Sequence, residues 1–106
     1  MKISKQELEK PIRKKKDGTF ATLEEVKGGD IILKEKMTSE DFVDLAIARY
    51  KTMDPLKATV VGKVSYTKSQ IIDEIKSGSE VGMKFVRMQT NFVQALLDKT
   101  NEIEFT

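Results

Sequence analysis

The sequence of 106 residues contains no cysteine, no histidine and no tryptophan, and only 2 prolines. Without cysteine the chain can form no disulfide and no thiolate metal or iron–sulfur site, and it has no thiol nucleophile. Without histidine it lacks the usual general base near neutral pH and every zinc or haem site that needs histidine. These absences exclude most small-enzyme mechanisms. We therefore expect a protein that is not an enzyme and that holds no cofactor and no metal.

Long apolar runs are also missing. No run approaches the roughly 18 residues of a membrane span, and residues 1–8 lack the apolar stretch of a signal peptide. We expect a cytoplasmic protein with no membrane contact. Hydrophobic residues make up 39% of the chain and charged residues 34%, which is typical of an ordinary globular domain. A chain of this size can bury one modest core, so residues 1–106 are expected to form a single domain.

Positive charge is concentrated at the N-terminus, although the formal net charge of the whole chain is only +2. Residues 1–16 contain seven lysines and arginines against two glutamates. Such a basic arm could bind nucleic acid through its phosphates. A solvated terminus is the interpretation we favour, because no aromatic residue is interleaved to stack on bases. The candidate nucleic-acid contacts are Lys10, Arg13, Lys14, Lys15 and Lys16.

Turn and breaker residues divide the first two thirds of the chain. Asp17-Gly18 favours a tight turn, so residues 11–24 can form an N-terminal hairpin in place of a loose arm over residues 1–18. Strands are predicted near 31–35, after Gly28-Gly29, and near 58–65, with Gly62 as a bulge or point of close approach. With a helix between them, these two strands are expected in one small sheet, with parallel strands and a right-handed crossover as one option.

Three helices are predicted, over residues 39–53, 68–77 and 80–99. Thr38 and Thr67 stand at N-cap positions, and Gln70 completes a capping-box pattern after Thr67. The last helix would be about 30 Å long, which is long for so small a body. Residues 102–106 are a further candidate strand. Together these elements predict an α/β or α+β fold: a small sheet, an N-terminal hairpin and three helices, the last one long.

The last predicted helix carries more apolar residues than a small sheet can cover. One series with heptad-like spacing is expected to face the core: Val81, Phe85, Met88, Phe92 and Ala95. A second set lies to one side and is expected to be exposed: Met83, Val86, Val93 and Leu97. A competing account is that the N-terminal hairpin covers this second set, but the charge of the hairpin disfavours it as a lid.

An exposed apolar patch of several hundred Å² commonly marks an interface. The leading hypothesis is therefore a non-catalytic protein-interaction module, for instance a small regulatory or adaptor protein. It would self-associate, as a homodimer, or bind a partner protein through Met83, Val86, Val93 and Leu97. The alternative is a small nucleic-acid-binding protein that uses the basic arm Lys10–Lys16. Nothing in the sequence indicates a small-molecule ligand.

Overall fold

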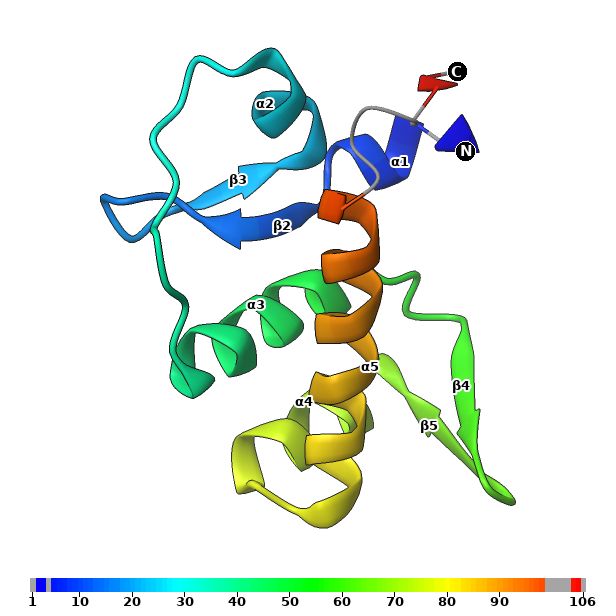
Figure 1. Cartoon of the computed structure of the whole chain (residues 1–106). Coiled ribbons are helices and arrows are strands. Elements are labelled where there is room, and N and C mark those ends of the chain that lie inside the picture. Colours follow the sequence, from blue (N-terminus) through cyan, green and yellow to red (C-terminus); the bar gives the residue numbers. More distant parts are fainter. Residues whose placement is uncertain (1, 4, 99–103, 106) are drawn as a thin grey trace.

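The computed structural model describes residues 2–3, 5–98 and 104–105, and it has a small α+β fold in which short β-hairpins alternate with helices (Figure 1). Helices α3 to α5 form the body, and α5 runs beside both hairpins. The elements in chain order are β1 (Lys2–Ile3), α1 (Lys5–Leu8), β2 (Pro11–Lys14), β3 (Phe20–Thr22), α2 (Leu23–Gly28), α3 (Ser39–Lys51), β4 (Ala58–Val61), β5 (Val64–Thr67), α4 (Lys68–Ser77), α5 (Glu80–Asp98) and β6 (Glu104–Phe105).

The N-terminal hairpin is confirmed. β2 and β3 pair antiparallel, and Gly18 adopts a positive φ of 92° in the turn between them. The second arm is shorter than expected, because the chain leaves the strand at Thr22 and begins α2. There the Thr22 side chain accepts from the backbone N–H of Glu25, and the Glu25 side chain accepts from the N–H of Thr22. Residues 23–24 are therefore helical.

The strand predicted near 31–35 is wrong. Only Leu33 makes a β-bridge, an isolated antiparallel one with Lys15. The guanidinium of Arg13 donates to the carbonyl oxygens of Lys34 and Glu35, at 2.9 and 3.1 Å. In the described part of the chain, backbone pairing of this segment with the first hairpin is limited to the bonds Lys16 N–H to Ile32 O, at 2.9 Å, and Lys34 N–H to Lys14 O, at 3.0 Å.

The single strand predicted near 58–65 is also wrong, because the segment is a second hairpin. β4 and β5 pair antiparallel from Ala58 and Thr67 to Val61 and Val64. Gly62, at φ 64°, supplies the turn and is not a bulge. The strands of the described residues form separate two-stranded sheets, so the predicted parallel crossover does not exist.

The third two-stranded sheet joins the two ends of the chain. β1 pairs in parallel with β6, which confirms a strand at Glu104–Phe105 within the predicted range 102–106. The other residues of that range lie outside the described part of the chain.

The three predicted helices are confirmed as α3, α4 and α5, with small changes at their ends. α3 ends at Lys51, two residues earlier than expected, and Lys99 lies outside the described residues. Thr38 and Thr67 are each the N-cap residue of a complete capping box. The side chains of Asp41 and Gln70 accept from the backbone N–H of Thr38 and Thr67, respectively. Helix starts were thus readable from the sequence.

The core consists of two apolar clusters that meet along α3 and α5. One lies under the first hairpin and α2, and its fully buried members include Ile12, Leu23, Leu45 and Leu96. The other lies among α3, α4 and the second hairpin. Its centre is Phe85, which makes edge-to-face contacts with Tyr50 at 5.6 Å and Tyr66 at 5.5 Å.

Candidate functional site

The exposed side of α5 is not the one predicted. Val86 and Val93 are only 8% and 3% exposed, since each belongs to one of the two clusters, and Met83 and Leu97 are partly buried against them. Met88 and Phe92, expected in the core, are 47% and 46% exposed.

Two parts of the fold cause this exchange: α3 and α4 cover Val86 and Met83, and the N-terminal hairpin covers the C-terminal half of α5. Ile12 and Leu23 pack in the same cluster as Val93. The competing account, in which the hairpin acts as a lid, is therefore the correct one for Val93. The charge of the hairpin does not prevent this packing, because its cations have partners within the chain.

Three of the five candidate nucleic-acid contacts are paired with carboxylates. Lys14 Nζ lies 3.0 Å from Asp41 and 3.2 Å from Asp44. The hydrogen bond from Asp41 raises the pKa of Lys14. Lys15 pairs with Glu25 at 3.1 Å, and Lys10 pairs with Glu7 at 3.3 Å.

Arg13 and Lys16 are the other two candidate nucleic-acid contacts. Arg13 binds the backbone carbonyls described above. Lys16 is exposed, and its backbone N–H donates to the carbonyl of Ile32 at 2.9 Å. Four of these five residues thus lie in the first hairpin, Lys10 directly precedes it, and Lys14 joins the hairpin to α3.

Asp41 is the anchor for this arrangement. Its carboxylate is buried and accepts from Lys34 Nζ at 2.5 Å, from Thr38 N at 2.9 Å and from Lys14 Nζ at 3.0 Å. The hydrogen bond from Lys34 is the largest of the effects that hold the pKa of Asp41 well below its usual range. Within the described ranges, no group of three or more histidine, cysteine or acidic residues is placed to hold a metal ion.

Arg49 is the second buried charged side chain, at 5% exposed, and no sequence pattern predicts its role. Its guanidinium donates to the Gln89 side chain at 2.7 Å, to the carbonyl of Pro11 at 2.8 Å and to the Glu7 carboxylate. It also lies over the ring of Phe92, at 5.4 Å from the centroid. One side chain of α3 thus joins α1, β2 and α5.

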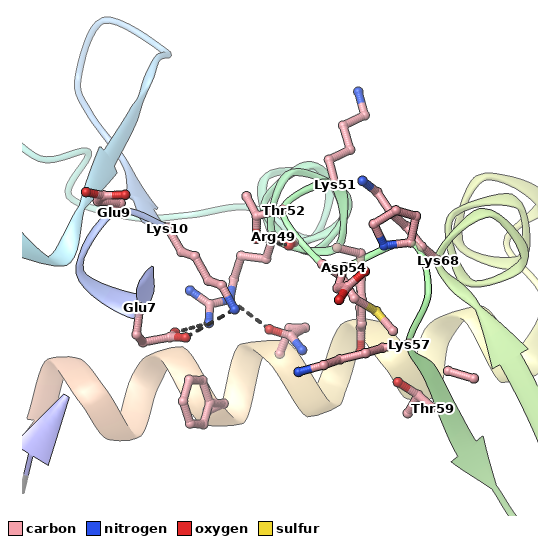
Figure 2. A pocket seen from close by; sticks show the side chains of 16 residues that line it. Glu7, Glu9, Lys10, Arg49, Lys51, Thr52, Asp54, Lys57, Thr59 and Lys68 are labelled. Atoms are coloured by element: carbon pink, nitrogen blue, oxygen red, sulfur yellow. Dashed lines mark hydrogen bonds and ion pairs between the residues drawn. The ribbon is translucent and has the colours of Figure 1, made fainter. Parts of the chain in front are cut away.

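Arg49 forms part of the wall of an open groove of about 990 Å³ (Figure 2). The groove lies between the end of α3, the segment 54–59, α1 and α5. Five cationic side chains and three carboxylates line it. Burial raises the pKa of the Tyr50 phenol in the same wall, so this hydroxyl is neutral at physiological pH.

The second hairpin and the residues just before it expose apolar side chains. Val60 is 66% exposed and Val64 52%, and Leu56, just before β4, is 93% exposed. Along β4 the exposed residues Ala58 and Val60 alternate with the partly buried residues Thr59 and Val61. The sequence does not indicate which face is exposed, since β-branched residues occur on both faces and are equally typical of a buried strand.

No protein-family model, curated protein or solved structure matches this chain. None of the helices in the described part of the chain combines the length and the apolar character that a membrane crossing requires. Function must therefore be argued from the surfaces described above.

Proposed function

We propose that the chain is a non-catalytic protein-interaction module that pairs with a second copy of itself through the exposed face of α5. The observation that carries this proposal is the half-exposure of Met88 and Phe92, one helical turn apart. The opposite face of α5 is already used, because it fills both apolar clusters. A second copy would cover the two exposed side chains and remove apolar surface from water. The proposal includes the cytoplasmic location that the sequence predicts.

The charges on this face favour an antiparallel pair. Lys84 and Arg87 are exposed in the first half of α5, and Asp98 is exposed at its end, where the helix dipole adds partial negative charge. Around a twofold axis near Asn91, Lys84 of each copy would approach Asp98 of the other. A parallel pair would place like charges side by side. A single helix face is a small contact, so we expect a dissociation constant in the micromolar range.

Sedimentation tests this proposal. At tens to hundreds of micromolar the wild type should show a monomer–dimer equilibrium, and Met88→Gln should shift it toward monomer. Lys84→Asp and Asp98→Lys should each weaken the dimer, and the double variant should recover it, because the exchanged charges attract again. A 12.0 kDa monomer at every concentration would refute the proposal.

Val93→Glu separates association from folding. Val93 is 3% exposed, so a carboxylate there would be buried without a partner and should unfold the chain. A folded Val93→Glu monomer would instead show that the opposite face of α5 is the interface.

A further inference from the structure

The free edge of the second hairpin is a separate surface from the exposed face of α5. The Gly62-Lys63 turn makes Val61 and Val64 a hydrogen-bonded pair, so the backbone N–H and C=O groups of Ala58 and Val60 point away from β5. No strand of the described residues pairs with that side of β4. Figure 1 shows the hairpin projecting from the helices. An unpaired edge of this kind can accept an extended segment as an additional strand.

Two exposed apolar side chains lie in β4 or close before it. Leu56, at 93% exposed, immediately precedes β4, and Val60, at 66% exposed, is within it. An added strand would partly cover both. Apolar contact would therefore add to the backbone hydrogen bonds that the edge offers.

The positive charge near the β4 edge indicates which kind of segment can bind there. The stretch 55–72 contains Lys57, Lys63 and Lys68 and no aspartate or glutamate. Within the part of the chain that the structure describes, none of these lysines pairs with a carboxylate. A second copy on this edge would bring the same lysines together, which is unfavourable. A segment rich in acidic residues would be attracted.

The edge is continuous with the groove. Lys57, Ala58 and Thr59 line the groove together with Lys68, and Figure 2 shows the Lys57 side chain extending along it. A segment that pairs with β4 can therefore continue past Ala58 into a space of about 990 Å³.

We infer that the β4 edge binds an acidic, extended segment of a partner protein by strand addition. The backbone of Ala58 and Val60 forms the new ladder, and acidic side chains lie beside Lys57, Lys63 and Lys68. This interaction uses no residue of the proposed α5 dimer face. The two proposals can therefore fail independently.

The probe is a fluorescently labelled peptide of nine residues that alternates glutamate and valine, with a lysine–valine peptide as its opposite-charge control. Fluorescence anisotropy should show micromolar binding of the acidic peptide only, weakening at least severalfold as salt rises from about 50 to 300 mM. Lys57→Glu/Lys63→Glu should weaken binding at least tenfold. The matched variant Lys16→Glu/Lys36→Glu changes the net charge equally but lies on other loops, and it should retain binding.

Ala58→Pro tests strand addition itself. Proline at the start of β4 removes the outward N–H without removing a hydrogen bond to β5, so the fold should persist, as circular dichroism would confirm. Binding of the acidic peptide should then fall severalfold. Wild-type affinity in Ala58→Pro would overturn strand addition. Equal loss in the matched lysine variant, no binding of the acidic peptide, or tighter binding of a single-stranded oligonucleotide of equal charge would overturn the inference as a whole.

Discussion

Replacement of Gly82 by alanine should destabilise the fold, because α4 and α5 touch at this position. A Cβ added to Gly82 would lie 2.7 Å from the backbone nitrogen of Ile75 and closer still to the carbonyl oxygen of Glu74. Both neighbours are backbone atoms, so no change of side-chain rotamer can relieve the contact. α4 and α5 would have to move apart, and the packing around Phe85 and Ile75 would loosen.

The size of the effect follows from two opposing contributions. Alanine gains about 1 kcal/mol over glycine in a helix interior. Overpacking costs about 1–3 kcal/mol, and a rigid backbone contact belongs at the upper end of that range. We therefore expect Gly82→Ala to lower the free energy of unfolding by about 1–2 kcal/mol. The matched control is Gly28→Ala at the end of α2, where no atom lies within 4 Å of the added Cβ and φ is not positive.

Urea unfolding followed by circular dichroism measures both variants on one scale. Gly82→Ala should move the unfolding midpoint to lower urea by about 0.5–1 M, whereas Gly28→Ala should leave it unchanged or raise it slightly. The same substitution in two helices is thus expected to have different effects. If Gly82→Ala were as stable as Gly28→Ala, the close approach of α4 and α5 would be refuted.

Two further predictions concern helix starts and acid stability. Thr38→Ala and Thr67→Ala should each lower the free energy of unfolding by about 1 kcal/mol, because each hydroxyl accepts the N3 backbone amide; unchanged urea midpoints would contradict the capping boxes. The pKa of Asp41 is lower in the folded chain than in the unfolded one, so its contribution is present above about pH 4 and is lost as the pH falls further. The melting temperature of Asp41→Asn should therefore fall less between pH 6 and pH 3 than that of the wild type, and an equal fall would contradict this role.

Helix positions were predictable because their signals are local. The threonine caps, the Gly78 end of α4 and the spacing of apolar residues all lie within a few residues of the feature that they determine. The turn at Asp17-Gly18 is local in the same sense: the Asp17 carboxylate accepts the N–H of Thr19 at 2.9 Å. The α+β class followed from these elements.

The predictions that failed depend on contacts between distant residues. Which side of α5 is exposed depends on how α3, α4 and the N-terminal hairpin pack against it. The pairing of Lys14 with Asp41 and Asp44 joins the hairpin to α3. The segment near 31–35 makes a single bridge, with Lys15 of the first hairpin, and Arg13, about twenty residues earlier, binds its carbonyls. The exposure of Val60 is likewise set by the position of a whole hairpin. These contacts join residues that are far apart in the chain, so the pattern of a single segment does not predict them.

Arg49 links the N-terminal segment, α1 and β2, to helices α3 and α5. Its buried guanidinium relies on Pro11 and Glu7 as well as on Gln89 of α5. If β2 and α1 separated from α3 while the helices stayed folded, Arg49 would exchange Pro11 and Glu7 for water, and the apolar contacts of Leu8 and Ile12 would be lost in the same step. Opening of the N-terminal segment therefore removes polar and apolar contacts together. Backbone amides of β2 should exchange with solvent nearly as slowly as those of α5, so the two clusters behave as one cooperative unit.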